Sequence, residues 1–313
     1  MSKTKIAISG IGAVGGFYGG LLAARYKNSE KTEVYFISRG ENLQKIKENG
    51  LEIKNTFLTI RANPKLATDN PVEIGPVDYL FCCTKSYDLE ENIAQLAPVI
   101  GPDTIIIPLL NGVDISERIQ KILPNNEVWK GCVYIGSRLV KPGRVEKFTM
   151  KERLYFGSKD GNKARQQTLR EILSNARIQS INPENIDFEI WKKFFMISTV
   201  ATITSYFNET IDNIIENHID LLITLGYELK SVAESKGIHF PDNYVFTSID
   251  SQKMMPNHST TSMHSDFQRG NRTEVETLTG YVVRTAQEAG IKVPTYQFMY
   301  RGLTEFPYPK RID

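Results

Sequence analysis

The chain has 313 residues, of which 41% are hydrophobic and 24% charged, so it can bury two domain cores and is not disordered throughout. Its 38 lysine and arginine residues nearly balance 36 acidic residues, and no block of like charge is long enough to follow a nucleic-acid backbone. The first apolar run, residues 6–8, is too short for a signal peptide or a membrane span. We therefore expect a cytoplasmic protein with no nucleic-acid partner and no membrane partner.

The N-terminal part alternates short runs rich in Ile, Val, Tyr and Phe with helical patterns, which predicts a parallel sheet with crossover helices. The expected strands are residues 5–9, 33–38, 79–84, 104–109, 127–133, 154–157 and 177–182, with a β-rich insertion at 51–66. The expected helices are residues 14–26, 41–49, 89–98, 115–123 and 163–175.

After Pro183 the strand signals almost stop, and helical patterns cover residues 186–207, 211–236 and 273–289, with a shorter one from 296. Residues 242–260 contain Pro, Asn, Ser and two methionines, a composition that predicts a loop able to fold over a ligand. The predicted fold class is therefore α/β. It consists of an N-terminal Rossmann-type parallel-sheet domain, residues 1–183, plus an all-α C-terminal domain, residues 184–313.

The first expected strand runs directly into a glycine motif, Gly-Ile-Gly-Ala-Val-Gly at residues 10–15, which opens the first helix. Gly10 permits the tight turn, Gly12 lets a pyrophosphate approach the backbone, and Gly15 lets helix and strand pack closely. The amides of the helix start, including Ala13 and Val14, then hold the anion. The alternative is a flexible glycine turn, but this strand-turn-helix context predicts dinucleotide binding.

The second expected strand ends in Ser38 and Arg39, where an acidic residue would accept a hydrogen bond from the ribose 2′-hydroxyl of NAD. Ser38 can donate to a 2′-phosphate, and Arg39 can pair with it or stack on adenine. This favours NADP(H) as the cofactor. In the alternative, Arg39 is a solvated loop residue and Glu41 binds the ribose of NAD.

Two further strand ends carry polar residues, Thr84-Lys85 and Asn111-Gly112. Ligands of such sheets lie outside the carboxyl ends of the strands, so these residues face the expected cofactor. Alternatively, Lys85 is an exposed charge and Asn111-Gly112 only a turn.

Two lysines, Lys192 and Lys193, interrupt a largely apolar helical pattern between Trp191 and Phe195. A reductase that uses a nicotinamide needs a donor for the developing alkoxide, and a lysine can serve. The alternative is that both lysines extend to solvent.

A second polar cluster covers residues 260–266 and is followed by Arg272-Thr273-Glu274. Hydroxyls near a helix start can bind a carboxylate, and an acid such as Glu274 is stabilised in a first helical turn. Alternatively, Thr273 and Glu276 form a capping box. His264 is not expected to be catalytic, because the four histidines show neither a Ser-His-Asp arrangement nor the spacing of metal ligands. The three cysteines predict no disulfide framework.

Together these residues resemble the ketopantoate reductases (2-dehydropantoate 2-reductases), which reduce 2-oxo acids with NADPH. The resemblance covers nearly the whole chain. It depends on the glycine motif, Ser38-Arg39, Thr84-Lys85, Asn111-Gly112, Trp191-Lys192-Lys193, Thr261-Ser262-Met263, Asp266 and Arg272-Thr273-Glu274.

The resemblance implies a role for five residues. Lys193 corresponds to the catalytic lysine that donates a proton to the carbonyl oxygen, and Lys192 to a bystander. Asn111 matches an asparagine between cofactor and substrate, and Lys85 a lysine near the cofactor phosphate and ribose. Ser262 matches the serine that holds the substrate carboxylate, and Glu274 the acid that orients the lysine or a substrate hydroxyl.

The chain departs from the family at two positions. The family's lysine is usually followed, four and eight residues later, by asparagines that bind the substrate, and here these positions are Ile197 and Ala201. A substrate hydroxyl buried there unpaired would cost about 1–3 kcal/mol. Ser198, Thr202 or Ser205 could compensate in part, although the helix spacing places none of them at the same spot.

The predicted function is NADPH-dependent reduction of a 2-oxo acid, with 2-dehydropantoate (ketopantoate) and pantothenate synthesis as the default. The alternatives are a related reductase of a less hydroxylated 2-oxo acid and a non-catalytic NADP-sensing protein. The sequence predicts no metal site and leaves a homodimer open, because an apolar helix face buries equally well within a chain or across a dimer.

Overall fold

The computed structural model describes residues 3–55 and 58–305. The chain divides into two compact units, Met1–Ile190 and Trp191–Asp313, and the division falls inside a long helix, α6 (Ile186–Phe207). The two units are called the N-terminal and the C-terminal unit below. Among the described residues, no helix is long and apolar enough to cross a membrane.

The N-terminal unit is built on a six-stranded sheet in the order β5-β2-β1-β6-β7-β8, in which every neighbouring pair is parallel. This confirms the predicted Rossmann-type sheet. The strands are β1 (Thr4–Ser9), β2 (Thr32–Ile37), β5 (Leu66–Thr68), β6 (Tyr79–Cys82), β7 (Ile105–Pro108) and β8 (Glu127–Val128).

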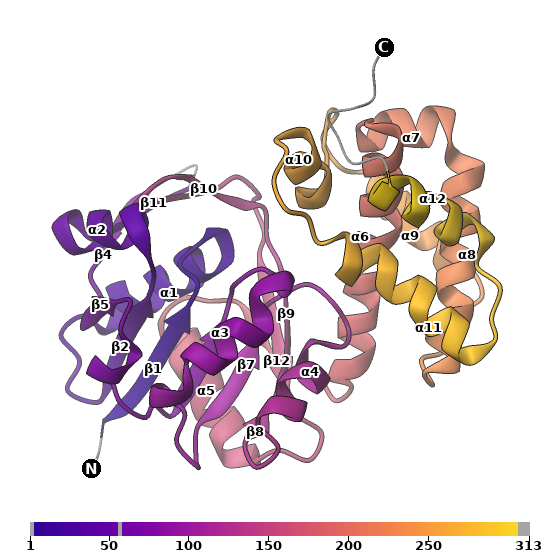
Figure 1. Cartoon of the computed structure of the whole chain (residues 1–313). Coiled ribbons are helices and arrows are strands. Elements are labelled where there is room, and N and C mark those ends of the chain that lie inside the picture. The colour runs from indigo at the N-terminus through magenta and orange to yellow at the C-terminus, as the bar shows by residue number, and fades with distance from the viewer. Residues whose placement is uncertain (1–2, 56–57, 306–313) are drawn as a thin grey trace. The chain divides into compact units, whose positions relative to one another are not determined.

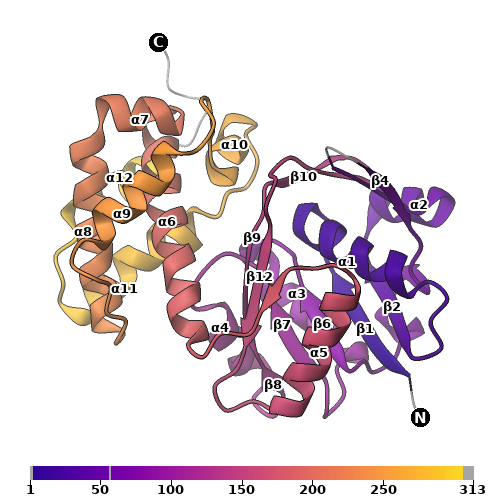
Figure 2. The ribbon, with the colours of Figure 1, turned by 180° about the vertical axis from the view of Figure 1, so that it is seen from behind.

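Helices cover both faces of this sheet because its side chains alternate between two apolar cores. Ile6 and Ile8 of β1 belong to a core shared with α1 (Ala13–Tyr26) and α5 (Lys163–Asn175). Ala7, between them, belongs to the opposite core, shared with α3 (Leu89–Gln95) and α4 (Ile115–Ile122). Figure 1 shows the face covered by α3 and α4, and Figure 2 shows α5 on the other face.

Two smaller sheets complete the N-terminal unit. One has the order β10-β11-β3-β4, and the other β13-β12-β9. The predicted strand 127–133 is in fact two strands in different sheets, because the chain leaves β7 at the fully buried Trp129 and pairs with β12 from Lys130 onward. The hairpin β10-β11 was not predicted, although Pro142 and Gly143 (φ +74°) mark its turn. The strands are β3 (Leu51–Lys54), β4 (Thr59–Ala62), β9 (Lys130–Tyr134), β10 (Ser137–Lys141), β11 (Arg144–Lys147), β12 (Arg153–Gly157) and β13 (Ser180–Ile181).

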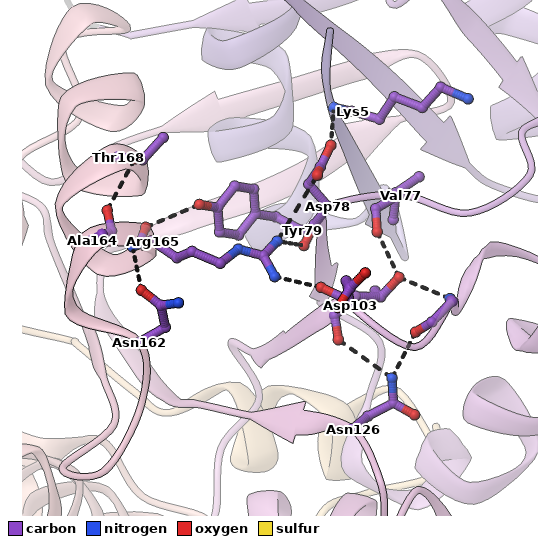
Figure 3. Close-up of polar contacts among 12 residues, drawn as sticks. Lys5, Val77, Asp78, Tyr79, Asp103, Asn126, Asn162, Ala164, Arg165 and Thr168 are labelled. Atoms are coloured by element: carbon purple, nitrogen blue, oxygen red, sulfur yellow. Dashed lines mark hydrogen bonds and ion pairs between the residues drawn. The ribbon is translucent and has the colours of Figure 1, made fainter. Parts of the chain in front are cut away.

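The amino edge of the parallel sheet is closed by a polar network centred on Arg165 of α5 (Figure 3). The Arg165 guanidinium donates to the backbone oxygens of Asp78, at 2.9 Å, and Asp103. The Tyr79 hydroxyl donates to the Arg165 carbonyl oxygen at 2.9 Å, and the Asp78 carboxylate accepts from the Lys5 amide at 2.8 Å. The network therefore attaches α5 to the first residues of three neighbouring strand segments.

The C-terminal unit is helical, as predicted, but two of its predicted boundaries were wrong. The pattern at 211–236 is two helices, because His218 leaves the helical conformation (φ −133°, ψ 24°). Residues 242–260 are not one loop, because they contain α9, whose buried residues Val245, Ser248, Ile249 and Gln252 have the spacing of one helix face. The helices after α6 are α7 (Ile211–Asn217), α8 (Ile219–Ser235), α9 (Tyr244–Lys253), α10 (Ser262–Gln268), α11 (Tyr281–Ala289) and α12 (Pro294–Glu305).

The predicted helix 273–289 is not uniform. It begins at Val275, passes through a π-helical turn, η4 (Glu276–Gly280), and continues as α11. Such turns are rare in helices and frequently mark functional sites.

Candidate functional site

Two of the three glycines in the motif stand where a side chain would collide with the backbone. Gly10 has φ +85°, and a Cβ there would lie 2.8 Å from the Thr84 backbone nitrogen. A Cβ on Gly15 would lie 2.2 Å from the Gly10 carbonyl oxygen. Gly12 differs from both, because a Cβ there would meet nothing within 4 Å. The turn is therefore closed behind Gly10 and Gly15 and open at Gly12.

The helix that starts at this turn can receive an anion. Gly12 caps α1 without a side-chain hydrogen bond, and no acidic residue stands in the first turn. The amides of Ala13, Val14 and Gly15 have no acceptor within their helix. With the open space at Gly12, this arrangement fits the pyrophosphate of a dinucleotide. Figure 1 shows the start of α1 following β1.

The residues named for the cofactor follow strand ends that the sheet aligns. Ser9 lies opposite Ile37 and Cys82, and Cys82 lies opposite Pro108. The structure therefore brings together at one edge the glycine motif, Ser38-Arg39, Thr84-Lys85 and Asn111-Gly112, which all come shortly after these strand ends.

The Thr84 hydroxyl at this edge is a further polar atom that the sequence reasoning gave no separate role. Its oxygen is buried and has no hydrogen-bond partner among the described residues. Buried polar groups are usually paired, so an atom of this kind at a proposed cofactor edge fits a ligand contact.

Arg39 and Glu41, the two residues proposed alternatively to bind the adenosine ribose of NADP or of NAD, both lie just after β2. Arg39 is exposed and is the N-cap residue of α2 (Gly40–Asn49), with an extended backbone at φ −129°. Glu41 is also exposed and stands in the first turn of the same helix. Both side chains can therefore reach a ligand beside Ser38, and the NADP and NAD interpretations stay as alternatives.

Asn42 is a residue of this edge that the sequence reasoning missed. Its amide nitrogen donates to the Ile11 carbonyl oxygen at 2.8 Å and to the Ser38 hydroxyl at 3.2 Å. Its amide oxygen accepts from the Gly143 backbone nitrogen at 2.8 Å. Asn42 thus connects the glycine turn, the end of β2 and the β10-β11 hairpin, three segments that are too far apart in the sequence for any local pattern to indicate the link.

Lys193 is a buried residue of α6. It is 7% exposed, so the alternative in which both lysines extend to solvent does not describe it. Its neighbours Trp191 and Phe194 both contact the Tyr281 ring, with centroid distances of 6.2 and 5.6 Å. Lys192 is less buried than Lys193.

Glu274 is buried at 3% exposure, but it is not a first-turn residue as predicted. Its carbonyl oxygen accepts from the amides of Thr277 and Leu278, at 3.0 and 2.9 Å, so it precedes the helix as a cap. The capping-box alternative was also wrong, because the Glu276 carboxylate accepts from Arg284 at 2.6 Å and from the Tyr300 hydroxyl at 2.7 Å.

Ser262 is the exposed first residue of α10, and Thr261 before it is the N-cap, accepting from the His264 amide at 3.2 Å. The Thr261 hydroxyl lies 3.3 Å from the Thr204 hydroxyl of α6. His264 is buried, its ring nitrogens bond to Asn208 and Thr260, and burial lowers its pKa. Both ring nitrogens of His264 are therefore engaged within the C-terminal unit.

The face of α6 after Lys193 is apolar at the two positions singled out in the sequence. Ile197 is half-buried and Ala201 is 1% exposed. Two of the three hydroxyls considered as substitutes are used within the fold, since Ser198 bonds to the Leu278 carbonyl oxygen and Thr202 to Thr279. The Ser205 hydroxyl is buried and has no hydrogen-bond partner among the described residues.

Comparison with known proteins matches both units. The family model "Ketopantoate reductase PanE/ApbA" matches residues 6–161, and its C-terminal counterpart matches residues 185–306. A solved 2-dehydropantoate 2-reductase from Porphyromonas gingivalis W83 is 40% identical, with a TM-score of 0.86 over 97% of this chain and 100% of that one.

Two further relatives show different degrees of likeness. An uncharacterized oxidoreductase, YkpB, of Bacillus subtilis (strain 168) is 27% identical over 98% of this chain and 100% of its own length. A dimeric ketopantoate reductase from Staphylococcus aureus is 23% identical, with a TM-score of 0.77 over 96% of this chain and 98% of that one, and at this identity the likeness shows the fold alone.

Proposed function

We propose that this chain, which belongs to the ketopantoate reductase family of oxidoreductases, reduces a 2-oxo acid to a 2-hydroxy acid with NADPH. The first substrate to consider is 2-dehydropantoate, which would be reduced to pantoate for pantothenate synthesis. The observation that carries the proposal is Lys193, a lysine of α6 that is only 7% exposed. A buried lysine of this kind can neutralise an alkoxide as it forms.

The residues of the N-terminal unit have binding roles in this proposal. The amides of Ala13, Val14 and Gly15 bind the pyrophosphate, with Gly12 leaving the space for it. Lys85 binds near the phosphate and ribose, and Asn111 lies toward the substrate. NADPH supplies the hydride when it is bound.

The residues of the C-terminal unit hold and orient the substrate. The Ser262 hydroxyl at the start of α10 would bind the carboxylate of the 2-oxo acid. Lys193 donates its proton to the carbonyl oxygen of the substrate, and Glu274 orients Lys193 or a hydroxyl of the substrate. These roles depend on the correspondence with the family's motifs.

NADPH is preferred over NADH in this proposal because Arg39 is exposed beside Ser38 at the end of β2. A guanidinium can pair bidentately with a 2′-phosphate. Glu41 supports the competing assignment, since a carboxylate accepts from a free 2′-hydroxyl and repels a phosphate.

A second candidate substrate is a less hydroxylated 2-oxo acid. Ile197 and Ala201 offer no hydrogen bonds on the face that follows Lys193, and the hydroxyls of Ser198 and Thr202 are already engaged. A polar acyl group would therefore lose hydrogen bonds there, whereas an apolar one would lose none.

The test is NADPH consumption by the purified protein with 2-dehydropantoate, beside a panel of branched and straight 2-oxo acids. The highest kcat/KM for 2-dehydropantoate supports the first candidate, and the highest value for an apolar 2-oxo acid supports the second. Tight NADPH binding with no turnover of any 2-oxo acid contradicts the proposal and favours a nucleotide-sensing protein.

Two properties of the whole molecule go with this function. The three cysteines are free thiols, as suits the reducing cytoplasm, where we propose the enzyme works. We also propose a homodimer, following the dimeric relative from S. aureus. Light scattering should give twice the mass of one chain, and the mass of a single chain would contradict it.

A further inference from the structure

One buried residue connects Glu274 to the helix that carries Lys193. The Leu278 amide donates to the Glu274 carbonyl oxygen at 2.9 Å, and the Leu278 carbonyl oxygen accepts from the Ser198 hydroxyl at 2.7 Å. Ser198 lies on α6, five residues after Lys193. Two consecutive hydrogen bonds thus lead from the backbone of Glu274 to this helix.

The carbonyl oxygen that Ser198 contacts lies within the π-helical turn. A π-helix closes its hydrogen bonds over five residues instead of four, so the usual ladder is interrupted where η4 joins α11. Leu278 is 1% exposed and Ser198 fully buried, so the hydrogen bond between them is shielded from solvent. Ser198 therefore donates to a backbone oxygen of the irregular turn and holds that turn against α6.

Ser198 is itself held from its other side. Its oxygen lies 2.9 Å from the Tyr296 hydroxyl, and because the single serine proton goes to Leu278, Tyr296 is the donor. Tyr296 is fixed in turn, since the buried Glu228 carboxylate accepts from the amides of Thr295 and Tyr296 at 2.8 and 2.9 Å. Carboxylate, tyrosine and serine form one chain of hydrogen bonds from α8 through α12 to α6 and η4.

We propose that Ser198, held by Tyr296, is a positioning residue that keeps the segment carrying Glu274 in register with Lys193. This inference depends on the proposed function, because it takes Lys193 and Glu274 as the reacting groups. It requires no contact of Ser198 with substrate or cofactor. A displacement of about 1 Å at a reacting group can cost about a hundredfold in rate, so a loosened turn lowers kcat.

The neighbouring residue provides a matched control. Thr199 is 2% exposed, and its hydroxyl donates to the Phe195 carbonyl oxygen of its own helix at 2.9 Å. Thr199→Val thus removes a buried hydroxyl that does not reach η4. We expect Ser198→Ala to lower kcat about tenfold, with the Kd for NADPH within about twofold of the wild type, and Thr199→Val to change neither by more than about twofold.

A double-mutant cycle with Glu274→Gln distinguishes positioning from general loosening of the unit. If Ser198 acts through Glu274, Ser198→Ala lowers kcat in the wild type but causes no further loss in Glu274→Gln. Equal losses in the two backgrounds, or an equal loss in Thr199→Val, would overturn the inference. If Glu274→Gln has no measurable turnover, the pH profile of kcat decides: it must change in Ser198→Ala and not in Thr199→Val, and unchanged profiles overturn the inference.

Two further variants keep the outcomes separable. Tyr296→Phe retains the bond between Ser198 and Leu278 and should lower kcat less than Ser198→Ala. If the alanine variant does not fold, the kcat of Tyr296→Phe tests the positioning role instead. Lys193→Ala tests the proposed function itself. If Lys193→Ala is inactive and Ser198→Ala behaves like the control, only the positioning role fails, whereas an active Lys193→Ala contradicts the proposed function.

Discussion

At the amino edge of the parallel sheet, polar side chains are paired with one another or with backbone, whereas at the carboxyl edge the start of α1 has no side-chain cap. Arg165, Asp78, Tyr79 and Lys5 bond to each other or to nearby backbone at the amino edge (Figure 3). The carboxyl edge has the open space at Gly12 and the Thr84 hydroxyl, which has no hydrogen-bond partner in the part of the chain that the structure describes. Paired groups stabilise the fold, whereas open amides and hydroxyls remain for a ligand, so substitutions at the two edges should affect different properties.

The largest difference is expected within the glycine motif itself. In Gly15→Ala the new methyl collides with the Gly10 carbonyl oxygen, which should lower the free energy of unfolding by about 3 kcal/mol. In Gly12→Ala the methyl enters open space, so stability should stay nearly unchanged while the Kd for NADPH rises at least about tenfold. Thermal unfolding and fluorescence titration with NADPH measure the two effects. A Gly12→Ala variant that binds NADPH as well as the wild type would remove the pyrophosphate assignment.

At the amino edge, Arg165→Ala should have the opposite effect. It leaves the carbonyl oxygens of Asp78 and Asp103 without their guanidinium donor, so we expect a loss of about 1–3 kcal/mol in the free energy of unfolding. The Kd for NADPH should not change, because Arg165 lies at the edge away from the glycine turn. Chemical denaturation and NADPH titration of the same preparation check both statements, and weakened binding at unchanged stability would reverse the assignment of the two edges.

Arg39→Ala tests whether the carboxyl edge binds the 2′-phosphate of NADPH. The variant should bind NADPH about tenfold more weakly and NADH about as well as the wild type, because only NADPH carries the 2′-phosphate. Glu41→Gln serves as the matched control on the same helix. Equal effects of Arg39→Ala on both cofactors would rule out the phosphate contact, and a selective loss of NADH in Glu41→Gln would favour NAD.

The smallest effect concerns a paired residue of the other unit, His264. Burial lowers its pKa in the folded protein, so the unfolded chain binds a proton more readily. Its contribution to stability is therefore present above the unfolded pKa of about 6.5 and is lost as the pH falls through it toward the folded pKa. The melting temperature should decrease from pH 7 to pH 5 more steeply in the wild type than in His264→Gln. If the melting temperatures of the wild type and of His264→Gln fell in parallel between pH 7 and pH 5, groups other than His264 would determine the pH dependence of stability.

The sequence predicted the fold class and the alignment of the residues proposed to bind the cofactor, because both depend on local patterns. Alternating apolar residues define β1 and β6, and the glycine motif has a fixed relation to the strand before it. The sequence did not predict Asn42, whose partners Ile11, Ser38 and Gly143 come together only in the folded sheet.

The errors in the C-terminal unit have a similar cause. The helix α9 was predicted as a loop because its composition, with Ser, Asn and Pro nearby, outweighed the spacing of its buried residues. The π-helical turn and the Ser198 bond to Leu278 depend on a partner helix about 80 residues away, which no window of the sequence contains.

The most direct test of the central claim is the rate of NADPH oxidation by Lys193→Ala with the best 2-oxo acid of the panel. If Lys193 donates the proton to the substrate oxygen, kcat should fall at least about a hundredfold while the Kd for NADPH stays within about twofold of the wild type. Turnover at the wild-type rate would contradict the account, because the reaction would then proceed without the buried lysine.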